Sequence, residues 1–265
     1  MPFVSAAGVE VHYVSHGPPD APRTAVILHG FPLDHRMCVN SFEPAFSSFP
    51  GWRRIYLDFP GMGRTRAPSW VASTDDVFRV TQAAIDALVP GPYALVGLSY
   101  GGYIAMGLAA AAADRVTGLA LVVPVVEPLH ARRSIAPQQV LVREPFVEGP
   151  EGFESMAVVV TAETVRRHMH EVEEPLQVAD AAAIERIESR YGGSFPLVDR
   201  FDRPALVVLG RQDNVLGFND QWRHSGQWPR ATVAVIDRAG HGLNSEQPEL
   251  FNVLLTDWLD RVVAG

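Results

Sequence analysis

Short runs of apolar residues recur along this chain, and stretches with a helical spacing of apolar residues separate them. The runs lie at residues 25–28, 54–58, 93–97, 116–123, 205–209 and 232–236, and residues 9–14 alternate between apolar and polar side chains. Unbroken apolar runs of this length are typical of strands covered on both faces, as in a parallel sheet. Strands alternating with helices predict a doubly wound, mostly parallel α/β sheet with right-handed crossovers.

Helices are predicted between these strands. Residues 74–89 carry apolar side chains at helical spacing and follow good N-cap residues. Residues 100–113 are rich in Ala and Gly, which indicates a helix packed closely on the sheet. A surface helix is predicted at 219–228 and the last helix at 248–263.

Residues 124–202 interrupt the alternation. This stretch has several prolines, no convincing buried strand, and amphipathic pieces at 157–172 and 180–191. We interpret it as a mostly helical insertion, of the kind that covers a site at the C-terminal edge of such a sheet. The predicted organisation is a core domain of residues 1–123 and 203–265 with a helical cap of residues 124–202.

Composition excludes several classes of function. The 22 Lys and Arg residues are all arginine, which excludes enzymes that depend on a lysine Schiff base or a P-loop lysine. The net charge of −8, without basic runs, argues against binding of nucleic acid or of an anionic membrane. The single cysteine, Cys38, excludes an internal disulfide, and neither a signal peptide nor a membrane span is evident. A cytoplasmic location is therefore expected.

The strongest chemical signal is Gly97-Leu-Ser99-Tyr-Gly101, which has the form G-x-S-x-G. It directly follows a predicted strand and precedes a predicted helix, the context that a nucleophile elbow requires. A serine on such a strained turn projects above the sheet, and glycines two residues away avoid steric clashes. The sequence therefore predicts Ser99 as a nucleophile.

A serine hydroxyl needs a base, and the base needs a carboxylate. His241 lies between two glycines after the last strand, and Asp213 follows the run at 205–209. Both are expected at the same sheet edge as Ser99. The predicted triad is Ser99, Asp213 and His241. A metal at His168 and His170 is disfavoured, because residues two apart on a helix do not share a face, and no cofactor is expected.

Acyl transfer also needs donors for the developing oxyanion. The backbone N–H of Tyr100, after the nucleophile, and that of Phe31, after the run at 25–28, are predicted to supply them. His29 is expected to brace this loop. The predicted pocket is lined by the side chains of Phe31, Tyr100, Val125, Leu129, Phe146, Met156, Val215 and Leu243. A substrate carboxylate would instead be recognised by arginines of the insertion, with Arg132, Arg133, Arg166 and Arg167 as candidates.

With these motifs the sequence resembles the α/β-hydrolase superfamily over residues 9–259. The resemblance is to its capped branch with a serine nucleophile, which has His29-Gly-Phe-Pro after strand three, Asp58-Phe-Pro-Gly after strand four and Gly97-Leu-Ser-Tyr-Gly at the elbow. It implies a sheet of about eight strands with a helical cap after strand six, and a structural role for Asp58, Gly61 and Gly63. Relatives in that branch include esterases, enol-lactone hydrolases and carbon–carbon bond hydrolases.

The functional hypothesis is a serine hydrolase that cleaves a small carboxylic ester or lactone through an acyl-enzyme. Carbon–carbon bond hydrolysis or acyl transfer on the same triad stay open as alternatives, as does a ligand receptor of the same fold with slow turnover. The expected partner is a small molecule, and the sequence leaves the oligomeric state open.

Overall fold

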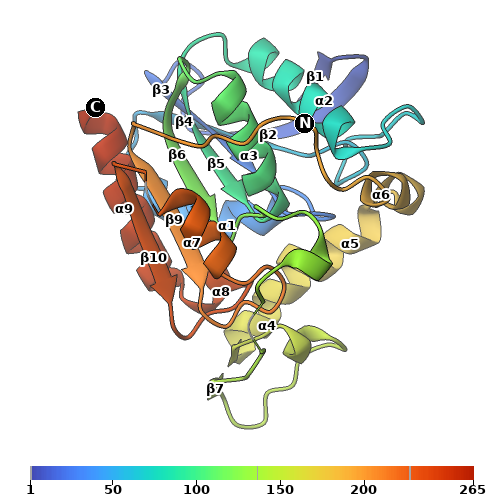
Figure 1. Cartoon of the computed structure of the whole chain (residues 1–265), viewed down its shortest axis with the longest axis vertical. Coiled ribbons are helices and arrows are strands. Elements are labelled where there is room, and N and C mark those ends of the chain that lie inside the picture. Colours follow the sequence, from blue (N-terminus) through green and yellow to red (C-terminus); the bar gives the residue numbers. More distant parts are fainter. Residues whose placement is uncertain (1, 136, 227) are drawn as a thin grey trace.

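The computed structural model describes residues 2–135, 137–226 and 228–265. The predicted ranges 1–123, 124–202 and 203–265 each contain one residue outside this description, namely residues 1, 136 and 227. Eight strands form one sheet in the order β1-β2-β4-β3-β5-β6-β9-β10 (Figure 1). The strands are β1 (Phe3–Ala6), β2 (Val9–His16), β3 (Arg23–Leu28), β4 (Trp52–Leu57), β5 (Tyr93–Leu98), β6 (Val116–Val122), β9 (Ala205–Gly210) and β10 (Ala231–Ile236).

The sheet is mostly parallel, as the sequence predicted. β4, β3, β5, β6, β9 and β10 pair in parallel, and β2 and β1 add an antiparallel edge. All residues of β5 and β9 are buried, which is the physical reason for their unbroken apolar sequences. β1 was not predicted, because its four residues carry little apolar periodicity.

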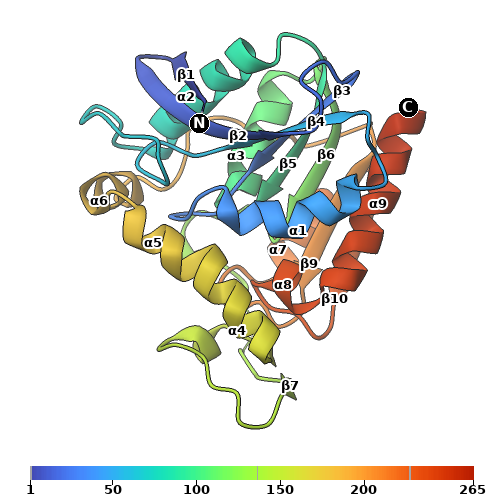
Figure 2. The ribbon, with the colours of Figure 1, turned by 180° about the vertical axis from the view of Figure 1, so that it is seen from behind.

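Helices cover both faces of the sheet. The helices α2 (Thr74–Leu88), α3 (Tyr100–Ala111) and α7 (Asn219–Ser225) lie on one face, and α1 (Arg36–Phe46) and α9 (Pro248–Ala264) on the other (Figures 1 and 2). The short α8 (Leu243–Glu246) precedes α9. Two large apolar clusters fill the space between the sheet and these two layers. No described helix has both the length and the apolar composition that a membrane crossing requires.

Local sequence explains most helix boundaries. The side chain of Ser73 accepts a hydrogen bond from the backbone N–H of Asp76 at the start of α2, as a good N-cap does. In contrast, α1 was not predicted, since it has no side-chain cap and contains Pro44.

The segment 124–202 adds no strand to the large sheet among its described residues. Its second part is helical, with α4 (Ala162–His168), a π-helical turn (Met169–Glu173), α5 (Glu174–Val178) and α6 (Ala181–Glu188). In its first part, the described residues form two 3-10 turns (His130–Arg132 and Phe153–Ser155) and the two-stranded pair of β7 (Val142–Arg143) and β8 (Val159–Val160). The prediction of a mostly helical segment was therefore wrong for its first part, where loops with prolines replace helices.

The turn between β5 and α3 depends on glycine. A Cβ on Gly101 would collide with the backbone oxygen of Leu28 and lie 2.6 Å from that of His29. A Cβ on Gly97 would lie 2.6 Å from the backbone of Gly101 and Gly102. The first turn of α3 therefore packs directly against the end of β3.

We expect Gly101→Ala to lower the free energy of unfolding by about 3 kcal/mol, because the new methyl group meets rigid backbone. Gly91→Ala is the matched control, since a Cβ at Gly91 has no neighbour within 4 Å. It should change the free energy of unfolding by less than about 0.5 kcal/mol. Urea denaturation of both variants tests this, and equal effects would contradict the close packing.

Candidate active site

Ser99 lies on the sharp turn between β5 and α3. Its backbone has φ +56° and ψ −116°, a conformation that a residue with a side chain rarely adopts. Hydrogen bonds hold the turn, since Ser99 N–H donates to Val122 O at 2.9 Å and Val125 N–H donates to Ser99 O at 3.1 Å. The strain is therefore balanced by contacts with the neighbouring strand and its loop.

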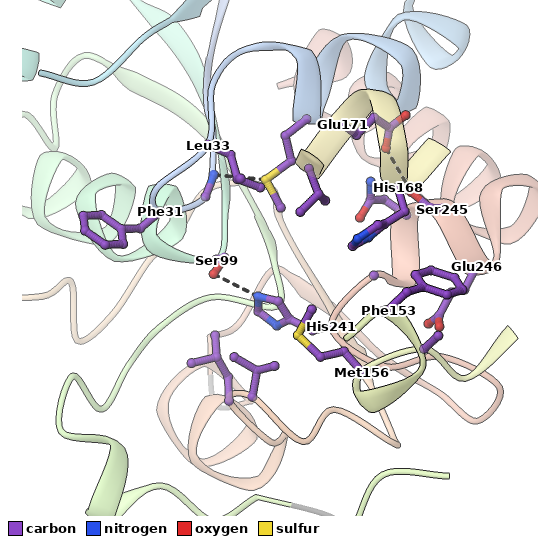
Figure 3. Close-up of a pocket in the computed structure, with 18 of the residues that line it drawn as sticks. Phe31, Leu33, Ser99, Phe153, Met156, His168, Glu171, His241, Ser245 and Glu246 are labelled. Atoms are coloured by element: carbon purple, nitrogen blue, oxygen red, sulfur yellow. Dashed lines mark hydrogen bonds between the residues drawn. The ribbon is translucent and has the colours of Figure 1, made fainter. Parts of the chain in front are cut away.

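A chain of hydrogen bonds joins Ser99, His241 and Asp213, although they are far apart in the sequence. His241 Nε2 lies 3.0 Å from Ser99 Oγ, and His241 Nδ1 lies 2.9 Å from Asp213 Oδ2. Because a carboxylate only accepts, Nδ1 carries the proton and Nε2 is left to accept from the serine hydroxyl. The structure thus brings together the three residues that the sequence singled out. Figure 3 shows the contact between Ser99 and His241.

Asp213 is held as a buried acceptor. Its second oxygen, Oδ1, accepts from the backbone N–H groups of Val215 at 2.8 Å and Leu216 at 2.9 Å, and the side chain is fully buried. These contacts fix the carboxylate in the loop after β9 and direct Oδ2 toward His241.

The loop after β3 lies beside this turn. His29 Nδ1 donates to Gly30 O at 2.8 Å, and its Nε2 accepts from Phe59 N–H at 3.1 Å, so His29 braces the loop as predicted. Burial lowers the pKa of His29, although the nearby Asp58 opposes this shift. Within the described chain, the backbone N–H groups of Phe31 and Tyr100 donate to no protein acceptor.

Ser99 and His241 open onto a cavity of about 350 Å³. Most of its wall is apolar, and much of it comes from the segment 124–202 (Figure 3). The apolar lining includes Phe31, Leu33, Met37, Phe153, Met156, Val159, Val172, Leu176, Tyr191, Val215 and Leu216. The size falls in the range of small-molecule sites.

Of the side chains predicted to line a substrate pocket, Phe31, Met156 and Val215 line this cavity, and the other five do not. Val125 packs with Tyr103 and with Leu216, which itself lines the cavity, and Leu243 belongs to the core beneath α9. Leu129 and Phe146 are exposed to solvent. Tyr100 is buried, and its hydroxyl donates to Thr74 Oγ1 at 3.1 Å. Burial raises the pKa of this hydroxyl.

Of the four candidate arginines, only Arg133 lines the cavity. Its guanidinium donates to the backbone oxygens of Glu127 at 2.9 Å, Pro128 at 3.0 Å and Val215 at 3.3 Å. Arg167 pairs with Glu171 at 3.0 Å, and Arg166 pairs with Glu163. Arg132 is exposed.

One wall of the cavity is polar, and the sequence did not predict it. It contains Thr164, His168, Glu171, Asn244, Ser245 and Glu246. Glu246 accepts from the backbone N–H groups of Gly240 at 2.7 Å and Val158 at 2.6 Å, so it ties the loop before His241 to β8 and its flank. Burial raises the pKa of Glu246, and these hydrogen bonds only partly oppose the shift. The six residues of this wall come from separate helical segments of the chain, so they form no local sequence motif.

Asp58 forms a second buried polar cluster. Its Oδ2 accepts from His12 Nδ1 at 2.7 Å, and its Oδ1 accepts from His35 Nδ1 at 2.8 Å. Within the described residues, these three side chains are the group whose spacing would suit a metal ion. The backbone N–H groups of His35 and Arg64 also donate to Asp58, so its oxygens are satisfied by protein donors. This fits the structural role that the sequence suggested for Asp58.

The cluster shifts the pKa of Asp58 and the pKa of His35. Burial opposes ionisation of Asp58, but the hydrogen bonds from His12 and His35 outweigh it and hold the pKa of Asp58 well below its usual range. Burial likewise opposes protonation of His35, but the hydrogen bond and the charge of Asp58 outweigh it and raise the pKa of His35.

The comparisons with known proteins agree with this architecture. A family model described as "Alpha/beta hydrolase family" matches residues 25–253, and the chain belongs to this family. A 2-hydroxy-6-oxononadienedioate/2-hydroxy-6-oxononatrienedioate hydrolase from Paraburkholderia phymatum is 27% identical over 271 residues, covering 95% of this chain and 91% of the relative. A 2-succinyl-6-hydroxy-2,4-cyclohexadiene-1-carboxylate synthase from Salmonella paratyphi B is 28% identical over 244 residues, covering 88% and 91%.

A solved structure also resembles this chain. It is an alpha/beta superfamily hydrolase from Oenococcus oeni, with a TM-score of 0.88 and 26% identity, and the match covers 99% of this chain and 98% of that one. The similarity therefore extends through the segment 124–202 as well as the sheet.

The Asp58 cluster predicts a specific pH dependence of stability. Because folding lowers the pKa of Asp58, its ionised form stabilises the fold above the unfolded pKa of about 4, and this contribution is lost as pH falls further. Because folding raises the pKa of His35, its protonated form stabilises the fold below about pH 6.5, and this contribution is lost as pH rises through the raised pKa.

Asp58→Asn should therefore lower the free energy of unfolding by about 3 kcal/mol between about pH 4 and 6.5. The loss should be smaller below and above this range. Urea denaturation across this pH range measures the difference from wild type. The exposed Asp20→Asn variant is the control and should show little difference throughout. A cost of Asp58→Asn that does not vary with pH would contradict the assignment.

Proposed function

We propose that this protein is a serine hydrolase that cleaves a small carboxylic ester or lactone through an acyl-enzyme. The observation that carries the proposal is the hydrogen-bonded chain from Ser99 through His241 to Asp213, with contacts of 3.0 and 2.9 Å, beside a mostly apolar cavity. This order and geometry suit general-base activation of a hydroxyl.

The proposed reaction has two halves. Ser99 Oγ attacks the ester carbonyl carbon while His241 Nε2 takes its proton, and Asp213 stabilises the resulting imidazolium. The backbone N–H groups of Phe31 and Tyr100 hold the negative charge on the carbonyl oxygen. His241 then protonates the leaving alcohol as the C–O bond breaks. In the second half, water loses a proton to His241 and attacks the acyl carbon. The bond between that carbon and Ser99 Oγ then breaks as His241 returns the proton to Oγ, which releases the acid and restores Ser99.

The segment 124–202 is proposed to act as the cap that sets specificity. It supplies Arg133, Phe153, Met156, Leu176 and Tyr191 to the cavity wall, whereas the nucleophile and the base come from the sheet edge. The proposed partner is thus a small molecule. We place the enzyme in the cytoplasm, where the single buried thiol of Cys38 stays reduced.

Charge favours a neutral substrate. The cavity wall holds the carboxyl groups of Glu171 and Glu246, and its only arginine within the described residues is Arg133. The guanidinium of Arg133 already donates to three backbone oxygens, so a substrate carboxylate would compete with them. An uncharged acyl group fits this balance better.

Hydrolysis of a carbon–carbon bond is a second candidate. It is favoured by the relative named as a 2-hydroxy-6-oxononadienedioate hydrolase, which matches 95% of this chain. The same serine, histidine and oxyanion donors would serve that reaction. A dioate, however, brings two carboxylates to a wall with a single arginine within the described chain, and this is why the ester is preferred.

A fluorophosphonate probe tests the nucleophile. We expect one probe per chain, attached to the peptide that contains Ser99, and a loss of ester hydrolysis by about 10⁴-fold or more in Ser99→Ala. Ser155→Ala is the control, because Ser155 lies in a 3-10 turn and its hydroxyl contacts Gly152 O. A probe adduct on another residue, or full activity of Ser99→Ala, would contradict the proposal.

Matched substrates test the charge argument. The kcat/KM for a phenyl ester with a neutral acyl chain should exceed that for the same ester with a terminal carboxylate by at least about tenfold, or about 1.4 kcal/mol. Equal values, or a preference for the carboxylate, would show that Arg133 is available to an anion. A vinylogous 1,5-diketone with terminal carboxylates, assayed in parallel, decides between ester and carbon–carbon cleavage.

A further inference from the structure

His168 points into the cavity from the wall that faces His241 and Ser99 (Figure 3). It is the last residue of α4, next to the π-helical turn Met169–Glu173. Single π-helical turns occur frequently at functional sites. None of the steps proposed above uses this imidazole.

Two contacts fix the ring. Its Nε2 lies 3.0 Å from Glu173 Oε1, and Phe153 packs edge-on with ring centroids 4.9 Å apart. Because an ionised carboxylate only accepts hydrogen bonds, Nε2 is the nitrogen that donates. In the neutral ring Nδ1 then carries a lone pair and accepts.

This Nδ1 has no donor. Across residues 2–135, 137–226 and 228–265, no backbone or side-chain group donates to it. The side chain is only 11% exposed, so bulk water has limited access. Nδ1 itself is not fully enclosed, so a water molecule or a ligand group that enters the cavity can donate to it.

The neighbouring acids are already engaged. Glu171 accepts from Arg167 Nε and from the Ser245 hydroxyl, both at 3.0 Å. Glu246 accepts from the backbone of Gly240 and Val158. Arg167 compensates the charge of Glu171, but the carboxylate of Glu173 lies against the imidazole of His168 and disfavours a further anion there. A neutral donor therefore suits this place better than a carboxylate.

We propose that His168 Nδ1 accepts a hydrogen bond from a hydroxyl group of the substrate, at a position remote from the scissile carbonyl. The substrate class is accordingly a neutral ester or lactone that carries a free hydroxyl. His168 is then the residue that sets this specificity. The inference rests on the proposed function, because it concerns the substrate of the same cavity.

Kinetics with matched esters test the inference. The panel is p-nitrophenyl hexanoate with its 3-hydroxy and 6-hydroxy forms, together with propyl hexanoate and 2-hydroxyethyl hexanoate. Hydrolysis of the unsubstituted esters reports on the proposed function alone. The ratio of kcat/KM between hydroxylated and unsubstituted ester reports on His168.

In wild type, at least one hydroxylated ester should be preferred by about tenfold, as expected for one hydrogen bond of about 1.4 kcal/mol. His168→Phe keeps a ring against Phe153 and should abolish the preference, measured as the ratio of kcat/KM between the hydroxylated and the unsubstituted ester. His168→Asn places an oxygen near the position of Nδ1 and should retain part of the preference. His170→Phe, an exposed neighbour, should leave the preference unchanged.

Binding provides a readout without turnover. Ser99→Ala should bind at least one of 3-hydroxyhexanamide, 6-hydroxyhexanamide and N-(2-hydroxyethyl)hexanamide more tightly than hexanamide or N-propylhexanamide, and Ser99→Ala/His168→Phe should not. If unsubstituted esters are hydrolysed but no hydroxylated form is preferred, or if His168→Phe keeps the preference, the role of His168 is overturned. If no ester is hydrolysed by wild type, the proposed function fails, and the binding comparison still decides on His168.

Discussion

The close contact between the first turn of α3 and the end of β3 determines where the chemical groups lie. Without side chains at Gly97 and Gly101, the helix backbone reaches the oxygens of Leu28 and His29. This contact places the turn of Ser99 beside the loop that carries Phe31. The two N–H groups proposed for the oxyanion thus come from segments whose separation is fixed by backbone packing, so little reorganisation is needed during the reaction.

Buried carboxylates organise the loops at the same sheet edge. Asp213 orients His241, and Glu246 joins the loop before His241 to the flank of β8. Asp58 joins β2 to the loop that begins α1. Each carboxylate accepts from protein donors on both oxygens, which compensates the cost of its burial. The loops after four strands are therefore held by hydrogen bonds rather than by apolar packing alone.

The sequence predicted the sheet and the chain of Ser99, His241 and Asp213 because their signals are local. Unbroken apolar runs marked the buried strands, and the three residues follow the ends of β5, β9 and β10. The cavity wall was harder to predict. Its first part comes from loops without periodicity, so nothing in the sequence distinguished Met156, which lines the cavity, from Phe146, which is exposed.

The polar wall was missed for a related reason. His168 and Glu171 lie in α4 and the following π-helical turn, and Ser245 lies in α8, so their proximity depends on how the segment 124–202 packs on the core. An isolated histidine in a helix carries no signal of its own. The same packing gives the cavity one polar and one apolar side, which is where we expect substrate selection to occur.

The central claim is that bond cleavage passes through an acyl group on Ser99, and product partitioning tests it directly. Several hexanoate esters with different leaving alcohols are hydrolysed in dilute methanol, and the ratio of methyl hexanoate to hexanoic acid is measured. A shared acyl-enzyme predicts the same ratio for every ester, because the leaving group has departed before methanol or water attacks. A ratio that changes with the leaving alcohol would contradict a common acyl-enzyme.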